Sequence, residues 1–338
     1  MADDGIAFDG RSAAAGPLGG AETAFVALAE ALAARGHRVE ARSHCAAPLV
    51  HRGVAWAPLA SGVPDACDLY IGNRGHRVIG LVRRARRRLF WLHNPARYLT
   101  KPRMLWRLAW YRPDLVTTSL YHAATVPPAS VFAGHQVIPY GVLDAFRHAE
   151  MREPPPPPRA VFTSNPLRGL DWLLDLGVGR SRPAVPEAEL HIYAGPAVYG
   201  DGAAKSGEME AVLARADALY EHGVRRHAPV GREALALVLT GARVMLYRGD
   251  PGETFCLALA DAQAMGVPAI VQPLGSVAER IVDGQTGRVA VSDGEFTEAA
   301  IAVLRDDDLW RRWHRTALAT QRGLGWDEVA ARYEALLG

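Results

Sequence analysis

The sequence is poor in cysteine and has no long hydrophobic run. Its 338 residues include only three cysteines, Cys45, Cys67 and Cys256, which lie far apart and form no Cys-x-x-Cys pair. This pattern excludes a disulfide scaffold and argues against a structural metal site. No stretch reaches the roughly 20 apolar residues of a membrane-spanning helix, and Met-Ala-Asp-Asp-Gly lacks the basic region of a signal peptide. We therefore expect a cytoplasmic protein.

The length and the 49% hydrophobic content predict two domains with substantial cores. Five consecutive prolines within residues 150–159 form a stiff spacer that suits neither a helix interior nor a central strand. We place a linker there, between domains at 1–149 and 160–322. In both parts short apolar runs alternate with helical segments, which predicts an α/β fold with parallel sheets. The runs that we expect as strands include Ile6–Phe8, Asp68–Gly72, Leu89–His93, Asp114–Thr117, Ala160–Thr163, Leu190–Gly195 and Val244–Tyr247.

The net charge of +2 hides a difference between the two halves of the chain. Residues 1–150 hold 18 basic and 11 acidic residues, whereas residues 151–338 hold 20 and 25. The densest basic run, Arg83–Arg88, could attract an anionic membrane or a phosphate-bearing acceptor, or it could form the solvated face of a helix. No recognition-helix or stacking pattern surrounds it, so we do not expect nucleic acid binding.

The stretch from Gly249 to Gly266 combines a polar loop with a run of helix-forming residues. Glu253 and Asp261 are eight residues apart, a spacing that would let both carboxylates face one side of a helix. A helix N-terminus attracts phosphate and carboxylates accept hydrogen bonds from hydroxyls, so the stretch fits a sugar nucleotide. Its acidic residues could instead do no more than stabilise the helix dipole.

Two further segments fit a ligand site at the end of a parallel sheet. Gly19 and Gly20 precede an Ala-rich helix at 21–34, which suits close approach of a ligand to the backbone, although the spacing is not the Gly-x-Gly-x-x-Gly fingerprint. His93 follows an apolar strand, where it could act in a cleft or serve as a structural hydrogen-bonding group. Asp306–Asp308 precedes a helical segment, so we expect helix capping there rather than metal binding.

Together these segments resemble the retaining nucleotide-sugar glycosyltransferases of family 4, which have the GT-B architecture. The matching segments are Gly19–Glu22, Glu253–Pro268, Leu274–Glu279 and Asp283–Gly287. The resemblance implies two Rossmann-like domains facing a central cleft, with a last helix, from about residue 323 to 338, that crosses back to the first domain. It implies a donor such as a UDP- or GDP-sugar, a glycan, lipopolysaccharide or glycolipid acceptor in cell-surface polysaccharide assembly, and no metal or other cofactor.

The same resemblance assigns roles to individual residues. Glu253 and His93 would act at the transferred sugar, the amides of Thr254 and Phe255 would hold the diphosphate, and Asp261 would bind the ribose. The other implied donor-site residues are Gly19 and Gly20 on the acceptor-side loop, Asn165 and Arg168 near the phosphates, and His227, in the Arg226-His227 loop, near the nucleobase.

Three residues depart from the family pattern. Asp261 replaces a glutamate, Thr163 stands where an arginine is usual, and Arg168 replaces a lysine. A thinner phosphate clamp leaves two alternatives open. One is a non-catalytic protein of this fold that binds a nucleotide sugar or a partner, and the other is a nucleotide-sugar epimerase.

Overall fold

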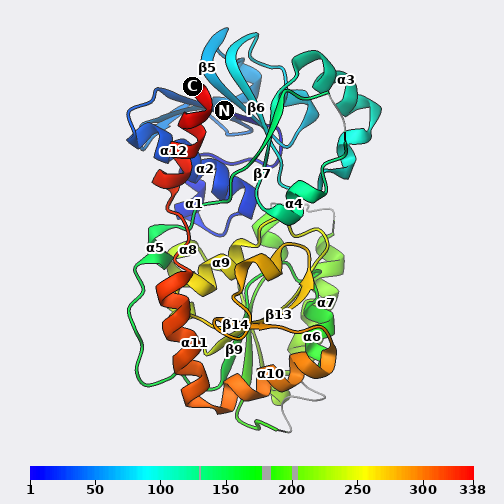
Figure 1. Cartoon of the computed structure of the whole chain (residues 1–338), viewed down its shortest axis with the longest axis vertical. Coiled ribbons are helices and arrows are strands. Elements are labelled where there is room, and N and C mark those ends of the chain that lie inside the picture. The colour runs from blue at the N-terminus through cyan, green and yellow to red at the C-terminus, as the bar shows by residue number, and fades with distance from the viewer. Residues whose placement is uncertain (129–130, 177–183, 200–204) are drawn as a thin grey trace. The chain divides into compact units, whose positions relative to one another are not determined.

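The computed structural model describes residues 1–128, 131–176, 184–199 and 205–338, which form two compact units. Unit 1 comprises Met1–Gly141 and Leu324–Gly338, and unit 2 comprises Val142–Gly323. Each unit is a sheet covered by helices (Figure 1). All the sheet pairings are parallel except that of β3 with β4, so the predicted α/β fold is confirmed.

Unit 1 is built on an eight-stranded sheet with the order β3-β4-β2-β1-β5-β6-β7-β8. Its strands are β1 Ala2–Asp3, β2 Val39–Ser43, β3 Leu49–His51, β4 Val54–Pro58, β5 Ala66–Asn73, β6 Arg84–Trp91, β7 Asp114–Thr117 and β8 Gly134–Val137. Its helices are α1 Ser12–Ala15, α2 Gly20–Ala34, α3 Pro102–Tyr111, α4 Leu120–Ala124 and α12 Trp326–Glu334.

The first strand lies earlier than the sequence suggested. We expected Ile6–Phe8, but β1 is Ala2–Asp3, and the apolar Phe8 follows it in a loop. Phe8 is 3% exposed and packs edge-on against Phe25 and Trp56. Phe8 is therefore hydrophobic because it is buried against helix α2 and strand β4, whereas β1 itself carries an aspartate.

The basic run Arg83–Arg88 lies largely in strand β6, so the alternative that it forms the solvated face of a helix is wrong. Arg87 pairs with Asp114 at 3.0 Å. Arg88 donates to two backbone carbonyls and lies over the rings of Tyr70 and Tyr111. Part of the run is therefore used inside the unit, where it joins β6 to its neighbours.

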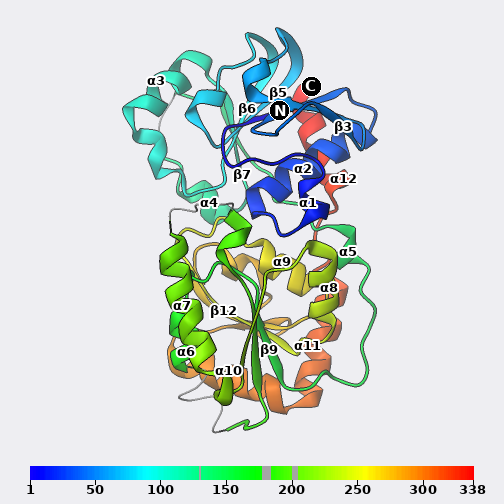
Figure 2. The same ribbon diagram turned by 180° about the vertical axis from the view of Figure 1, so that it is seen from behind.

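Unit 2 is built on a six-stranded parallel sheet with the order β11-β10-β9-β12-β13-β14. Its strands are β9 Arg159–Phe162, β10 Glu189–Tyr193, β11 Val224–His227, β12 Val244–Gly249, β13 Ala269–Leu274 and β14 Gly287–Val289. Its helices are α5 Asp144–Arg147, α6 Leu170–Leu176, α7 Ser206–Ala218, α8 Arg232–Thr240, α9 Leu257–Ala264, α10 Asp293–Arg305 and α11 Asp307–Thr320. Helices α6 and α7 lie on one flank of this sheet, and α8 and α11 lie on the other (Figure 2). As expected for a cap, Asp306 accepts hydrogen bonds from the amides of Asp308 and Leu309 at the start of α11.

The division between the units comes before the proline-rich segment that the sequence suggested as the linker. It lies between Gly141 and Val142, because the short helix α5 belongs to unit 2. Phe146 on α5 is fully buried, and the Arg232 guanidinium of α8 lies 4.8 Å from the centre of its ring. The contact anchors the chain to unit 2 before the prolines begin.

The end of the chain returns to unit 1. Helix α12 packs along α2 (Figure 1), with Val329 and Tyr333 fully buried. Arg35, just after α2, pairs with Asp327 at 2.9 Å and with Glu334 at 2.7 Å. Each helix in the described part of the chain is too short or too polar to span a bilayer.

Candidate active site

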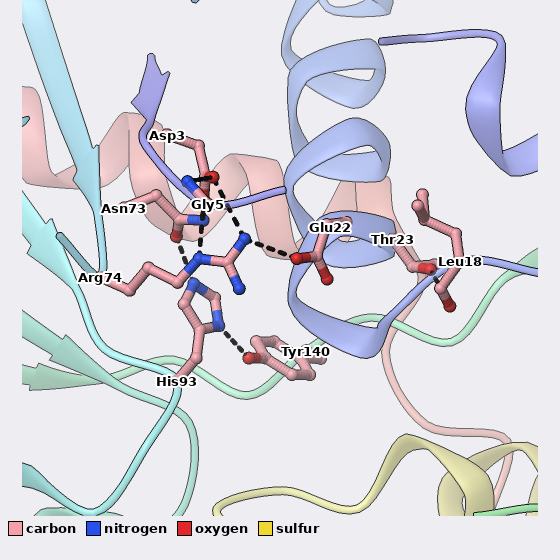
Figure 3. A network of polar contacts seen from close by, with 9 residues as sticks. All are labelled: Asp3, Gly5, Leu18, Glu22, Thr23, Asn73, Arg74, His93 and Tyr140. Atoms are coloured by element: carbon pink, nitrogen blue, oxygen red, sulfur yellow. Dashed lines mark hydrogen bonds and ion pairs between the residues drawn. The ribbon is translucent and has the colours of Figure 1, made fainter. Parts of the chain in front are cut away.

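In unit 1, polar side chains gather where four parallel strands end. Asp3 and Asn73 are the last residues of β1 and β5, His93 follows β6, and Tyr140 follows β8 (Figure 3). Asp3 and Asn73 are fully buried, and His93 is 8% exposed. Since ligands of open α/β sheets collect at the carboxyl ends of strands, this cluster is where a site is expected.

The hydrogen bonds of His93 define its tautomer. The Asn73 amide nitrogen donates to Asp3, so the Asn73 carbonyl oxygen must accept from Nε2–H of His93. The other ring nitrogen, Nδ1, then accepts from the Tyr140 hydroxyl. Burial, followed by the nearby positive charge of Arg74, lowers the pKa of His93 well below its usual value. His93 is therefore neutral at physiological pH, with both nitrogens engaged.

An ion-pair network fixes the start of α2 to the same strand ends. Arg74 donates to Asp3 at 3.0 and 3.1 Å and to Glu22, in the first turn of α2, at 2.5 Å (Figure 3). Burial acts to lower the pKa of Arg74, but the charges of Glu22 and Asp3 outweigh it and raise the pKa. Gly19, which is buried, caps this helix, and Gly20, which is exposed, begins it two residues before Glu22. The network thus positions the glycine loop whose amides begin the helix.

In unit 2, the loop before α9 departs from the geometry that the sequence suggested. Cys256 adopts a left-handed conformation with φ 67°, and the helix begins only at Leu257. Glu253 therefore lies outside the helix, and helical spacing does not relate it to Asp261. The loop is compact because Gly275 has φ 71°, and a Cβ atom there would lie 2.2 Å from the Asp250 carbonyl oxygen.

Glu253 is 6% exposed and is held by two donors. The Tyr247 hydroxyl donates to Oε1 at 2.7 Å, and the Arg168 guanidinium donates to the same oxygen. Burial and the Glu253 charge raise the pKa of Tyr247 well above its usual value, so Tyr247 remains a donor. Oε2 of Glu253 has no hydrogen bond or ion pair among the residues that the structure describes.

Asp261 has a different partner. It is fully buried on α9, and its Oδ2 accepts from Arg232 at the start of α8. Its Oδ1 has no partner within the described residues. Burial raises the pKa of Asp261 to about 6, although the charge of Arg232 opposes the shift. The two carboxylates that we expected on one face thus bind two separate arginines.

Asn165 and Arg168, which we expected near the phosphates, lie in one turn after β9. The Asn165 side chain accepts from the Leu167 amide at 2.9 Å, and the Asn165 carbonyl accepts from the Arg168 amide at 2.9 Å. Asn165 thereby shapes the loop that presents Arg168. Phe255, following Glu253 and the buried Thr254, lies with its ring centre 4.5 Å from the Arg280 guanidinium.

Arg226 and His227 are the last two residues of strand β11, so they do not form the loop that the resemblance implied. The His227 ring stacks on Tyr193 with centroids 4.4 Å apart. The Glu189 carboxylate accepts from Nε2 of His191, so Nδ1 of His191 accepts from Nε2–H of His227 at 3.0 Å. Burial, followed by the charge of His191, lowers the pKa of His227. Arg226, beside it, instead pairs with acidic residues of α7.

Sequence reasoning missed Tyr247, Arg232 and the ion-pair network of unit 1. In the sequence, Tyr247 is indistinguishable from the other apolar residues of its strand, and Arg232 looks like any residue at the start of a helix. The one available signal was Glu22, which stands directly after the glycine loop. Its partner Arg74 lies 52 residues later in the chain, and Asn73 lies 70 residues after Asp3, to which it donates. No local pattern reveals contacts over such separations.

Comparison with known proteins gives a family match within unit 2. Residues 158–306 match the family Glycosyl transferases group 1. A D-inositol 3-phosphate glycosyltransferase from Streptomyces coelicolor is 34% identical over 156 residues, which are 45% of this chain but only 32% of that protein. This chain therefore spans about a third of the length of the curated relative.

Solved structures show that the fold extends over nearly the whole chain. Sucrose-phosphate synthase from Thermosynechococcus elongatus is 16% identical, with a TM-score of 0.74 over 98% of this chain and 97% of that one. An Anabaena protein in complex with UDP-glucose is 12% identical, with a TM-score of 0.69 over 94% and 96%. The resemblance drawn from the sequence is thus confirmed: the chain has the two Rossmann-like units of the GT-B fold, and the model of the family Glycosyl transferases group 1 matches its residues 158–306.

Proposed function

We propose that the protein is a retaining glycosyltransferase that moves a sugar from a nucleoside-diphosphate sugar to a glycan or lipid-linked acceptor in cell-surface polysaccharide assembly. The observation that carries the proposal is the fixed carboxylate of Glu253, within the segment that matches the family. Tyr247 and Arg168 hold one oxygen, which leaves Oε2 to accept hydrogen bonds from sugar hydroxyls.

The phosphate side of the reaction requires positive charge and amide donors where the leaving diphosphate becomes more negative. Arg168 and the backbone amides of Thr254 and Phe255 would supply them, without a metal ion. Arg168 has a partly exposed side chain, so it can reach a phosphate while its loop stays fixed by Asn165. The acceptor hydroxyl would attack from the face that the diphosphate leaves, so no separate general base is assigned.

His93 and Asp261 take narrower roles than the sequence suggested. A neutral His93 cannot supply positive charge, so we assign it to shape the sugar side of unit 1 through Asn73 and Tyr140. Asp261 is fully buried, whereas the side chain of its partner Arg232 is 18% exposed. We therefore propose that Asp261 positions Arg232 and that Arg232 contacts the donor nucleotide. His227, stacked on Tyr193, remains our candidate beside the nucleobase.

The first test is binding and transfer with a panel of donors and acceptors. UDP-glucose is included because the Anabaena neighbour binds it, and inositol phosphate because the Streptomyces relative is named for it. We expect one nucleotide to raise the melting temperature. We also expect transfer to release nucleoside diphosphate and to retain the anomeric configuration of the sugar, as read by NMR.

The residue assignment is tested with Glu253→Gln, and Glu298→Gln, at an exposed position of α10, serves as the charge-matched control. Hydrogen bonds to a charged group contribute about 1.5–3 kcal/mol, so we expect Glu253→Gln to lower kcat/KM about 10- to 100-fold. The control should remain within about twofold. Transfer at the wild-type rate by Glu253→Gln would refute the role of Glu253. Donor binding by the wild-type protein without any transfer would favour a binding protein.

A further inference from the structure

Helix α3, Pro102–Tyr111, exposes two tryptophans that the fold does not use. Trp106 is 54% exposed and Trp110 is 78% exposed. Because they are four residues apart, they lie on the same side of the helix. On the opposite side Met104 and Leu108, 3% and 0% exposed, pack into the core of unit 1. The helix is thus anchored through one face and presents indoles on the other.

The segment of the chain that carries these tryptophans is strongly basic. Residues 69–113 contain 12 lysines and arginines and no aspartate or glutamate. Arg97, Lys101 and Arg103 are exposed and form no ion pair within the described parts of the chain. The Arg107 guanidinium lies 4.6 Å from the centre of the Trp106 ring. The next acidic residue, Asp114, is already paired with Arg87.

The combination fits one kind of partner better than others. Tryptophan favours the headgroup level of a bilayer, where its ring is half apolar and half hydrated, and arginine is attracted to anionic phospholipids. A helical or extended peptide partner would be bound in an apolar groove, whereas the exposed tryptophans lie on a single helix, α3, at the flank of unit 1 away from α2 and α12 (Figures 1 and 2). Exposed side chains on one face of a helix can lie against a deformable lipid surface without a groove.

We propose that α3 is a docking surface for an anionic phospholipid bilayer. Trp106 and Trp110 enter the headgroup region, and Arg103 and Arg107, with Arg97 and Lys101 before the helix, contact lipid phosphates. The sequence suggested Arg83–Arg88 for such a contact. That run lies largely in a strand, it carries no tryptophan, and Arg87 and Arg88 are used internally. The docking surface does not depend on the proposed glycosyl transfer.

The test is flotation of the full chain with vesicles of phosphatidylcholine alone or with about 30 mol% phosphatidylglycerol, at low and at physiological salt. We expect binding only to the anionic vesicles, weaker at higher salt. Trp106→Ala with Trp110→Ala should lower the partition coefficient about tenfold or more, because interfacial binding scales with the apolar area inserted. Arg103→Ala with Arg107→Ala should lower it and reduce its salt dependence.

Matched controls separate this surface from general stickiness. Val50→Ala and Leu237→Ala remove apolar side chains that are 76% and 74% exposed elsewhere, and both should bind as wild type. The triple Ala variant of Arg83, Arg84 and Arg86 should keep at least half of the binding. No binding to anionic vesicles, or full binding by the double tryptophan variant, would overturn the proposal. Loss of binding only in the triple variant would assign the contact to β6, and tight binding of single-stranded RNA without vesicle binding would assign α3 to nucleic acid.

Discussion

Replacing Arg74 by methionine should destabilise unit 1 strongly. Methionine keeps much of the aliphatic stem but removes the guanidinium that pairs with Asp3 and Glu22. These carboxylates have side chains that are 0% and 7% exposed. Breaking a buried ion pair by removing one partner costs about 3–5 kcal/mol, because a charge remains buried without compensation.

The structure suggests a value at the lower end of that range. Asp3 keeps the amide donors of Gly5 and Asn73, so its charge stays partly satisfied, while Glu22 loses the only ion pair that it forms in the described structure. We therefore expect a loss of about 3 kcal/mol, a large part of the 5–15 kcal/mol typical of a domain. Adding Glu22→Gln to Arg74→Met should recover about 1 kcal/mol or more, since it removes the unpaired charge.

The assay is urea unfolding combined with hydrogen exchange read by mass spectrometry. Peptides from α2 and β5 should lose protection in Arg74→Met, whereas peptides from the unit 2 sheet should not. Arg38→Met is the control, because the side chain of Arg38 is 91% exposed although it pairs with Glu40. It should cost less than about 0.5 kcal/mol. A loss below about 1 kcal/mol in Arg74→Met, or loss of protection in unit 2 instead, would refute the reasoning.

Three further predictions concern backbone strain and buried titrating groups. Gly275→Ala should cost about 3 kcal/mol in thermal unfolding because of its φ of 71° and the clash with Asp250, whereas Gly284→Ala, with the same φ and open space, should cost about 1 kcal/mol. Burial lowers the pKa of His122 to about 4, so the unfolded chain binds a proton below pH 6.5 that the folded chain does not bind. The free energy of unfolding should therefore drop by up to about 3 kcal/mol between pH 6.5 and 4. The drop should be smaller in His122→Gln, which cannot bind this proton. Burial raises the pKa of Asp261 to about 6, so its ionisation disfavours the folded state as pH rises from 4 to 6. Over that interval the free energy of unfolding of Asp261→Asn should rise by about 2 kcal/mol relative to that of the wild type. Parallel pH profiles of the two proteins would contradict this.

Local patterns predicted most of the fold. Strand β7 lies where the sequence placed it, at Asp114–Thr117, and helix α2, Gly20–Ala34, begins one residue before the Ala-rich helix expected at 21–34. Strand β1 was missed because two residues, Ala-Asp, carry no strand signal. Its pairing depends on β2 and β5, which lie about 40 and 70 residues later.

The candidate site was predicted in its residues but not in its connections. Glu253 was identified from its motif, yet its partners Arg168 and Tyr247 come from different elements, which only the folded sheet brings together. The helical spacing between Glu253 and Asp261 misled because Cys256 leaves the helical conformation between them. A single left-handed residue of this kind has no signal in the sequence, since it is not a glycine or an asparagine.

The return of α12 to unit 1 also has a consequence for biosynthesis. A growing chain emerges from the ribosome with its N-terminal end first, but the surface of α2 that α12 covers has to wait for residues after Leu324. Unit 2 is one continuous segment and can complete its fold earlier. We therefore expect the unit whose residues are made first to be finished last, with the hydrophobic side of α2 open to chaperones until α12 has been made.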